Sequence, residues 1–310
     1  MQIQILKNRT KSRRTIIAVL ALLITLTVVG CKFGLEEAFF RPNGVNERSK
    51  ELTTLTLPSD VTRSAIYQSG KYCFMILTDV HYGAGSDVPE THILNWIDKF
   101  DTTEETKAQK PLFCIVLGDI VENGNREDFA AFNTFQDKLE RKGIPVYCIV
   151  GNHDLLNSGW NYWKYSCNPH TSFYCFKTST VSWYFTDTGS GTMGSAQFSA
   201  LEAAFKNDSN RKLVLSHYPL YGGGTGIPIF SIGNTKERAK IIDLYAENNV
   251  KYVFEGHWHI GGEYDFGKFK EFAGKTLKSG KWYLVSIDET IAADENPVTA
   301  VEEIDIHPQN

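Results

Sequence analysis

The sequence predicts an α/β protein built on a parallel sheet. Within residues 71–154, three apolar runs short enough for buried strands alternate with two segments of helical periodicity. This alternation is typical of βαβ units, whose crossovers are right-handed. Hydrophobic residues make up 42% and charged residues 22% of the 310 residues, which is ordinary globular composition. A chain of this length can bury one large core or two small ones.

The first half of the pattern contains three strands and two helices. Ile93, Ile97 and Phe100 share one face of the first predicted helix. The second predicted helix has acids early, bases late and a glycine at its end. The predicted strands cover residues 72–79, 111–119 and 144–154, and the predicted helices cover residues 92–100 and 126–143.

The second half adds an antiparallel strand pair and further strand and helix segments. Aromatic residues alternate along residues 172–189, which predicts the pair. Thr235 precedes a helical run and is a favourable cap. Besides the pair, the predicted elements are helices at 195–207 and 235–249 and strands at 212–219, 251–259, 281–288 and 300–306.

Polar side chains that can bind metals follow five of the apolar strands. In open α/β sheets, ligands bind beyond the carboxyl ends of the strands, so these side chains are expected to converge. Five of the eight histidines of the chain belong to this set, which a scatter of surface or core histidines would not produce. The set consists of Asp79, His81, Asp119, Asn152, His153, Asp154, His217, His257 and His259.

These side chains offer oxygen and imidazole ligands and no thiolate. Such a ligand set suits Mn, Fe or Zn in a hydrolytic site better than it suits a structural zinc. His257 and His259 stand two residues apart, and side chains at such positions on a regular strand point the same way. If they bind different metals, the segment beyond Gly256 is expected to be a loop, with Trp258 packing as structure.

The order of the motifs, D-x-H, G-D, G-N-H-D, H and G-H-x-H, resembles the calcineurin-like metallophosphoesterase superfamily. The resemblance covers roughly residues 71–290 and implies a four-layer α/β/β/α metallophosphoesterase sandwich. It also implies hydrolysis of phosphomonoesters or phosphodiesters by a hydroxide activated by two divalent or trivalent metal ions. The alternative is a membrane-tethered binding or scaffolding module on the same fold.

The resemblance implies a role for each motif residue. One metal is expected on Asp79, His81 and His259, and the second on Asn152, His217 and His257. Asp119 is expected to bridge the two metals. His153 is expected to face the leaving-group oxygen, with Asp154 as the carboxylate that orients it.

Two subgroups of the superfamily fit less well. Glu122 occupies the position where purple acid phosphatases carry a tyrosine ligand, and residues 151–154 lack the continuation found in 5′-nucleotidases. The stretch GDIVENG at 118–124 most resembles the subgroup that holds cyclic-nucleotide phosphodiesterases and related phosphatases. The substrate is a phosphate ester, and its identity stays open at this point.

Residues 1–30 have the pattern of a secretory signal. An apolar run of fifteen residues covers roughly 22 Å, which is short of the ~30 Å hydrocarbon core. The sequence VVGC ending at Cys31 resembles the lipobox of bacterial lipoproteins, which implies lipidation of Cys31 and a place in the cell envelope. An uncleaved N-terminal anchor is the alternative. A basic cluster precedes the run: Lys7, Arg9, Lys11, Arg13 and Arg14.

The expected organisation is a signal peptide at 1–30, a tether and lead-in segment at 31–70 and the catalytic domain at 71–310. Removing the leader takes the formal net charge from −4 to −9. An acidic chain is a poor match for a polymeric nucleic acid, so we expect no such partner. An extracytoplasmic location would permit a disulfide between Cys167 and Cys175, which the sequence leaves open.

Overall fold

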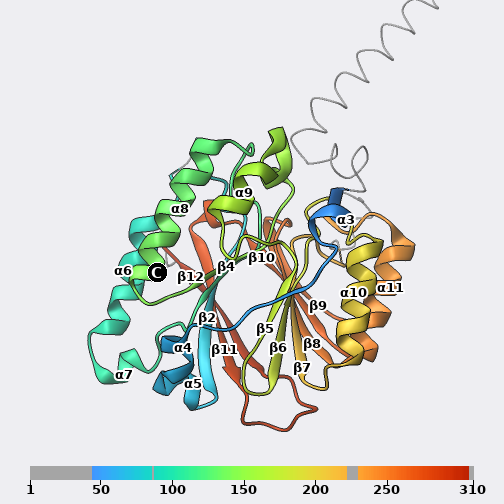
Figure 1. Ribbon diagram of the computed structural model, residues 1–310. Coiled ribbons are helices and arrows are strands. Elements are labelled where there is room, and N and C mark those ends of the chain that lie inside the picture. The colour runs from blue at the N-terminus through green and yellow to red at the C-terminus, as the bar shows by residue number, and fades with distance from the viewer. Residues whose placement is uncertain (1–43, 86, 222–229, 307–310) are drawn as a thin grey trace, which may run out of the picture.

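The computed structural model describes residues 44–85, 87–221 and 230–306, which form two β-sheets flanked by helices. The two sheets pack against each other through a shared apolar core. Helices cover the outer face of each sheet, at opposite sides of the molecule (Figure 1). The predicted four-layer α/β/β/α sandwich is therefore confirmed.

The smaller sheet has five strands in the order β12-β11-β2-β3-β4. Its parallel part, β2-β3-β4, is the βαβ pattern that the sequence predicted, and β11 joins it antiparallel to both β2 and β12. The strands are β2 (Lys71–Leu77), β3 (Cys114–Val116), β4 (Val146–Cys148), β11 (Lys281–Asp288) and β12 (Val298–Asp305).

The larger sheet has seven strands in the order β1-β5-β6-β7-β8-β10-β9. The predicted antiparallel pair is β5 and β6, and β6, β7 and β8 run parallel. Strands β9 and β10 were not predicted. The strands are β1 (Thr53–Thr54), β5 (Tyr174–Lys177), β6 (Val181–Phe185), β7 (Arg211–Leu215), β8 (Val250–Glu255), β9 (Ile260–Asp265) and β10 (Lys270–Lys275).

Amphipathic helices cover the two sheets. In α8 (Arg126–Arg141), Phe129, Phe132, Phe135 and Leu139 are buried at helical spacing. The other helices are α3 (Gly44–Arg48), α4 (Ser59–Arg63), α5 (Ala65–Gln68), α6 (Glu90–Asp98), α7 (Glu104–Lys107), α9 (Trp160–Ser166), α10 (Ser195–Lys206) and α11 (Thr235–Glu247). Short 3-10 turns lie at Lys99–Asp101, His153–Ser158 and Leu277–Ser279.

Aromatic side chains from both sheets fill the space between them. Phe74 of the smaller sheet meets Trp183 of the larger one edge to face, with ring centroids 5.0 Å apart. Its contact with Phe254 has the same geometry at 5.7 Å. Aromatic pairs in these geometries stabilise a core beyond the burial of their area. The two sheets are therefore held as one body, which fixes the relative positions of their strand ends.

Residues 44–70, in the segment expected to be a tether and lead-in, pack against the rest of the fold. Val45 and Val61 are buried, and β1 pairs in parallel with β5 at the edge of the larger sheet. Arg48 forms an ion pair with Asp187, with Nε 2.9 Å from Oδ2. The expected signal peptide at 1–30 and the lipidation site Cys31 lie outside the described residues. Within the described ranges, the longest apolar helices are too short or too polar to cross a bilayer.

Cys167 and Cys175, whose pairing the sequence left open, are free thiols in the structure. Cys167 packs in the core between the smaller sheet and its helices, whereas Cys175 packs in the core on the outer face of the larger sheet. Because the two side chains occupy different cores, they do not pair.

Candidate metal centre

The polar side chains predicted from the strand ends come together between the two sheets. Strands β2, β3 and β4 of the smaller sheet and β7 and β8 of the larger sheet all end at this place. Hydrogen bonds join successive strand ends, since the amide of Asp79 donates to the carbonyl of Gly118 and that of His81 to the carbonyl of Asp119. The convergence predicted from the sequence is confirmed, although the strands come from two sheets.

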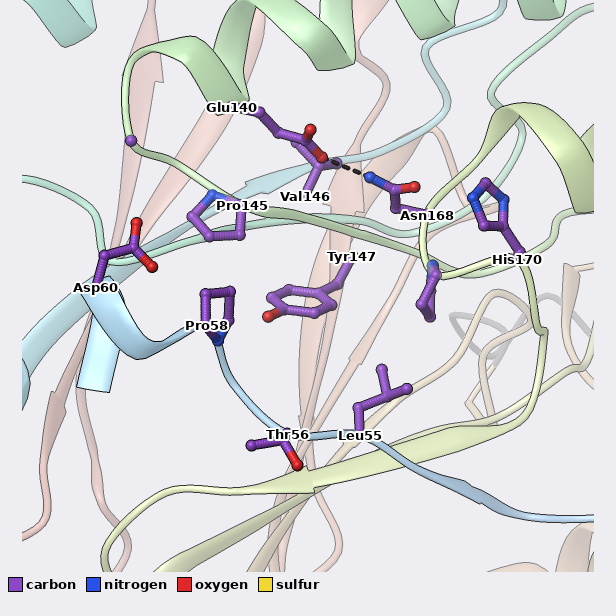
Figure 2. Close-up of a pocket in the computed structure, with 12 residues that line it drawn as sticks. Leu55, Thr56, Pro58, Asp60, Glu140, Pro145, Val146, Tyr147, Asn168 and His170 are labelled. Carbon is purple, nitrogen blue, oxygen red and sulfur yellow. Dashed lines mark hydrogen bonds between the residues drawn. The ribbon is translucent and has the colours of Figure 1, made fainter. Parts of the chain in front are cut away.

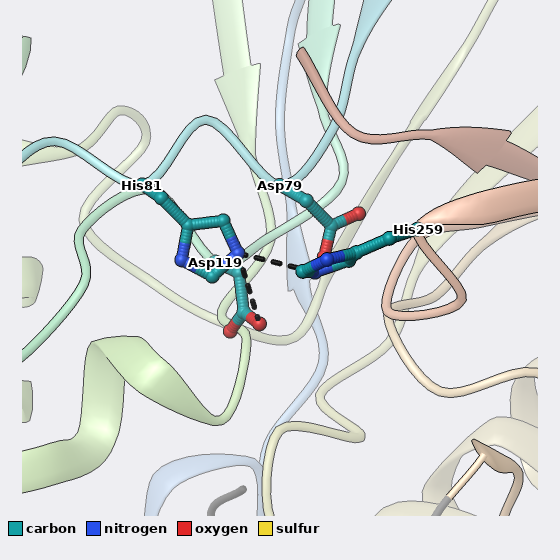
Figure 3. A group of neighbouring side chains, drawn as sticks. All are labelled: Asp79, His81, Asp119 and His259. Atoms are coloured by element: carbon teal, nitrogen blue, oxygen red, sulfur yellow. Dashed lines mark hydrogen bonds and ion pairs between the residues drawn. The ribbon is translucent and has the colours of Figure 1, made fainter. Parts of the chain in front are cut away.

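The first cluster consists of Asp79, His81, Asp119 and His259, whose ligand atoms all lie within 4.8 Å of one another (Figure 3). The Nε2 atoms of His81 and His259 are 3.2 Å apart. The Nε2 atom of His259 lies 3.2 Å from Oδ1 of Asp79. Three of these side chains are buried and His259 is partly exposed, so the cluster has one side open to solvent.

The second cluster consists of Asp119, His217 and His257. Oδ1 of Asn152 lies 3.1 Å from Nε2 of His217, which adds the amide oxygen to this group. The ring of Tyr218 stacks on that of His257 with centroids 3.8 Å apart. Tyr218 therefore supports a residue of the centre, a role the sequence analysis did not assign to it.

Asp119 lies between the two clusters, with one oxygen toward each. Its Oδ2 is 4.0 Å from Nε2 of His81, and its Oδ1 is 3.4 Å from Nε2 of His217. Oδ1 also accepts a hydrogen bond from the amide of His153 at 2.8 Å. A carboxylate in this position is able to contact two cations at once.

The backbone is bent sharply at the residues that supply the centre. Asp79, His81, Asp119 and His257 all have φ between 48° and 62°, in the left-handed region that few non-glycine residues adopt. Such conformations concentrate at functional sites, where the surrounding structure holds them in place. At Gly118, which has φ of 83°, an added Cβ would lie 2.7 Å from Nδ1 of His217. Only glycine fits here, because the strand end and the imidazole approach so closely.

A second layer of hydrogen bonds orients the ligand side chains. The Nδ1 atom of His217 donates to the carbonyl of Leu117 at 2.7 Å, which directs Nε2 toward Asp119 and Asn152. The hydroxyl of Thr78 donates to Oδ2 of Asp79. The His81 ring contacts Glu122, with Nδ1 3.0 Å from Oε2. The sequence predicted no role for Thr78 or Leu117, and Glu122 was considered only in the comparison with purple acid phosphatases.

The orienting role predicted for Asp154 is wrong. Its Oδ1 accepts hydrogen bonds from the amides of Ile120 and Val121, and its Oδ2 accepts one from the amide of Gly151. The carboxylate is fully buried and tied to the backbone of the loops that carry the ligands. The Nδ1 atom of His153 instead donates to the carbonyl oxygen of Glu122 at 2.7 Å.

The buried carboxylates and imidazoles of the centre shift the pKa values of one another. Burial raises the pKa of Asp119, but the nearby His217 and His153 outweigh it and hold the pKa well below its usual range. Burial lowers the pKa of His217, yet the neighbouring Asp119 carboxylate raises it overall, to about 9. The centre therefore joins anionic carboxylates to basic imidazoles, which is also the character of a metal site.

The residues present fit two metal ions. Nitrogen and oxygen atoms converge without a hydrocarbon group between them, and the two imidazole nitrogens at 3.2 Å face each other. The Nδ2 atom of Asn152 is buried and has no hydrogen-bond partner among the described residues. Burial of an unsatisfied amide is unfavourable, so the residue is held here for its carbonyl oxygen. A hard oxygen and imidazole set suits Mn, Fe or Zn.

Among the described residues, two histidines, His92 and His170, belong to none of the groups of side chains that could hold a metal. Both are exposed. His170 lines a pocket of about 550 Å³ together with Pro58, Tyr147 and Asn168, whose amide donates to Glu140 (Figure 2). No lining residue of this pocket belongs to either cluster.

The fold and the centre together define a class of protein. A two-sheet α/β sandwich with two Asp/His clusters joined by a shared carboxylate is the arrangement of a metal-dependent phosphoesterase. Residues 74–261 match the family described as calcineurin-like phosphoesterase, and the chain belongs to this family. The protein is therefore a hydrolase of phosphate esters, and the predicted family resemblance is confirmed.

Two relatives by sequence are both described as probable cyclic nucleotide phosphodiesterases. A probable cyclic nucleotide phosphodiesterase of Fibrobacter succinogenes is 27% identical over 191 residues, which cover 59% of this chain and 71% of the relative. A probable cyclic nucleotide phosphodiesterase of Xenorhabdus bovienii is 26% identical over 196 residues, which cover 59% of this chain and 76% of the relative.

Solved structures agree on the fold. A dimetal phosphatase from Danio rerio superposes with a TM-score of 0.56 at 15% identity, covering 70% of this chain and 93% of its own. The purple acid phosphatase PPD1 from yellow lupin seeds superposes with a TM-score of 0.52 at 12% identity, covering 77% of this chain and 54% of its own. At these identities, the similarity establishes the architecture alone.

Proposed function

We propose that this protein hydrolyses small phosphodiesters, with cyclic nucleotides as the leading substrate class, at a centre of two metal ions. The observation that carries the proposal is Asp119, whose two oxygens face two separate ligand clusters. The descriptions of the two relatives support the choice of cyclic nucleotides. Phosphomonoesters are the competing substrate class.

In this proposal the two clusters hold one metal each. Asp79, His81 and His259 hold the first, and Asn152, His217 and His257 hold the second. Asp119 would face both ions, and its negative charge would lower the repulsion between two close cations. The two metals would supply positive charge for the phosphoryl oxygens and lower the pKa of a water molecule, so that a nucleophile is present at neutral pH.

In this proposal His153 acts on the leaving group. Its ring lies beside that of His81, with centroids 4.8 Å apart, and is partly exposed. Because its Nδ1 donates to the carbonyl of Glu122, the Nε2 atom is left to face the substrate. A histidine in this position stabilises or protonates the departing oxygen.

The neutral amide of Asn152 suits an anionic substrate. It contributes an oxygen ligand without adding negative charge, so the loaded centre keeps more of its positive charge. A phosphodiester carries one negative charge and is attracted to such a site. The scaffolding alternative has weaker support, since every predicted ligand is present in one of the two clusters or next to it.

The test compares hydrolysis of bis-p-nitrophenyl phosphate, p-nitrophenyl phosphate and 3′,5′-cyclic AMP with added Mn²⁺, for wild type and Asp119→Asn. We expect the diesters to be turned over faster than the monoester, and the variant to lose most of its activity. Faster hydrolysis of the monoester would refute the diesterase assignment. Equal activity of wild type and variant, or no metal dependence, would refute the two-metal mechanism.

We also propose that Cys31 is lipidated and tethers the protein to the bacterial cell envelope. The lipobox-like sequence VVGC and the basic and apolar segments before it support this. Labelling with radioactive palmitate is expected to mark wild type but not Cys31→Ala. A labelled Cys31→Ala variant would mean that another residue is lipidated, and an unlabelled wild type with an unprocessed mass would favour the uncleaved anchor.

A further inference from the structure

Glu122 contacts two histidines of the centre, His81 and His153, and the proposed chemistry does not use its side chain. It lies in the loop after β3, three residues beyond Asp119, and its amide donates to the carbonyl of Tyr82 at 2.8 Å. This bond pairs its backbone with the segment that carries His81. The loop therefore holds Glu122 beside the first cluster.

The carboxylate of Glu122 contacts one imidazole and one lysine. Oε2 lies 3.0 Å from Nδ1 of His81 and 3.0 Å from Nζ of Lys278. The side chain of His81 is 1% exposed and that of Glu122 is 28% exposed, so the contact forms at the wall of the centre. The backbone carbonyl of Glu122 separately accepts a hydrogen bond from His153.

Glu122 meets two histidines in different ways. Its carbonyl accepts a hydrogen bond from Nδ1 of His153, which fixes the tautomer of that ring. The Nδ1 atom of His81 is buried and has no hydrogen-bond partner among the described residues, and the Glu122 carboxylate lies beside it at 3.0 Å as an ion-pair contact. A histidine that donates its Nδ1 proton to an acceptor has a lone pair on Nε2, which is then available as a metal ligand. In His81 this Nε2 points away from Glu122 and faces Nε2 of His259 at 3.2 Å. The carboxylate acts on His81 and the carbonyl acts on His153, so a side-chain substitution separates the two effects.

We propose that Glu122 is the positioning residue of His81, with Lys278 holding the carboxylate in place. The inference rests on the proposed function, because it takes His81 as a metal ligand. Carboxylates in this relation to a ligating histidine typically change metal affinity 10- to 100-fold when they are removed. Their removal affects the metal that the histidine binds and leaves a neighbouring metal in place.

A direct role for Glu122 as a ligand is the competing explanation. His81, Glu122 and His153 form a compact group that could itself hold an ion. However, Nδ1 of His153 donates to the Glu122 carbonyl, and the Glu122 carboxylate lies at hydrogen-bond distance from Nδ1 of His81. Nδ1 of His153 and Oε2 of Glu122 are therefore already engaged, the latter also by Nζ of Lys278.

The experiment measures Mn²⁺ binding to metal-free protein by titration, for wild type, Glu122→Ala and Glu122→Gln. Glu303→Gln is the matched control. Glu303 lies on β12, is 30% exposed, and pairs with Lys275 of β10 and Lys281 of β11. We expect wild type to bind two equivalents. Glu122→Ala should weaken one equivalent by about 10- to 100-fold. Glu122→Gln, which keeps an acceptor oxygen, should lose less, and Glu303→Gln should bind as wild type.

Other outcomes would overturn the inference. Unchanged affinity in Glu122→Ala would show that His81 needs no such support, and equal weakening of both equivalents would indicate a general structural role. Three equivalents in wild type falling to two in the variant would make Glu122 a ligand. The melting temperature of each metal-free variant controls for misfolding, and Glu122→Gln keeps the test valid if Glu122→Ala does not fold. Two equivalents in wild type without hydrolysis would refute the proposed function alone.

Discussion

His257 and His259 leave one short loop and join different clusters. The loop begins where β8 ends at Glu255, and His257 has φ of 62°, so the two side chains do not alternate as on a strand. His257 joins Asp119 and His217, whereas His259 joins Asp79 and His81. The prediction that this segment is a loop is confirmed. Trp258 packs against Gly262 of β9, as a structural residue would.

This division predicts separate metal losses at the residue scale. His257→Ala should lose one metal equivalent and His259→Ala the other, because each removes a ligand from one cluster. Metal content after dialysis, combined with the activity restored by excess Mn²⁺, would measure this. Glu303→Gln serves as the control. Retention of two equivalents in both variants would mean that neither imidazole is a ligand.

His153 gives a second prediction at this scale. His153→Asn should lower kcat by about 10²- to 10⁴-fold for a substrate with a poor leaving group, since general acid catalysis is lost. The loss should be smaller for p-nitrophenyl esters, whose leaving group needs little protonation. Metal content should stay at the wild-type level, because the ring donates to Glu122 rather than completing a cluster. Equal losses for both substrates would contradict the leaving-group role.

At the element scale, the segment before residue 71 contributes to the stability of the domain. Val45, Leu57 and Val61 are buried, β1 extends the larger sheet, and Arg48 pairs with Asp187. Asp187 is followed by Thr188, whose hydroxyl accepts a hydrogen bond from the amide of His217 at 3.1 Å. The segment is therefore tied to the loop beside a predicted ligand.

Truncation tests this contribution. Compared with a chain that starts at residue 44, one that starts at residue 71 should be destabilised by several kcal/mol or fail to fold. Burial of each aliphatic side chain is worth about 1.5–3 kcal/mol, against a total stability of roughly 5–15 kcal/mol. Thermal unfolding of the two chains would decide. Equal melting temperatures would mean that residues 44–70 add no stability and that the domain begins at residue 71.

The N-terminal cap of α11 lies one residue before its predicted position. Thr235 was the predicted cap of α11, but the cap is Asn234, whose side chain accepts hydrogen bonds from the amides of Lys236 and Glu237. Both residues are good caps by composition. The choice between them depends on where the preceding loop enters the helix, which is decided by packing against the larger sheet.

Two buried carboxyls in the larger sheet set a pH dependence for the whole molecule. Burial raises the pKa of Glu255 on β8 well above its usual range. It also raises the pKa of Glu271 on the neighbouring strand β10, to about 7. The folded protein binds protons there that the unfolded chain, with a pKa near 4.5, has released. Stability should therefore fall as the pH rises from about 4.5 through 7.

Glu271→Gln tests this dependence. Gln keeps an oxygen that can accept from the amides of Leu220 and Tyr221 but carries no charge. Between pH 5 and pH 8, we expect the free energy of unfolding to fall less in the variant than in wild type. Each unit of pKa shift corresponds to about 1.4 kcal/mol. Chemical denaturation across that range measures it, and parallel curves would show that Glu271 does not titrate there.

At the scale of the whole molecule, the order of strands and helices and the list of candidate ligands could be predicted from the sequence. Apolar runs and helical periodicity are local features of the sequence, and the D-x-H to G-H-x-H motifs are recognised by their order along the chain. The predicted helix at 126–143 and strand at 281–288 agree closely with α8 and β11. Strand β9 was missed because Ile260–Asp265 is mostly exposed and carries little apolar alternation. Strand β10 was missed because Lys270–Lys275, although mostly buried, has Phe272 as its one large apolar residue.

The sequence by itself determined the family, the α/β alternation and the residue types of the centre, since each depends on the identity and order of residues. Only the tertiary structure decided that the strand ends come from two sheets, that Asp154 holds backbone amides and that Glu122 contacts His81. These facts depend on contacts between segments distant in the chain. Hydrogen-bond partners of that kind are selected by packing and leave no periodic signal in the sequence.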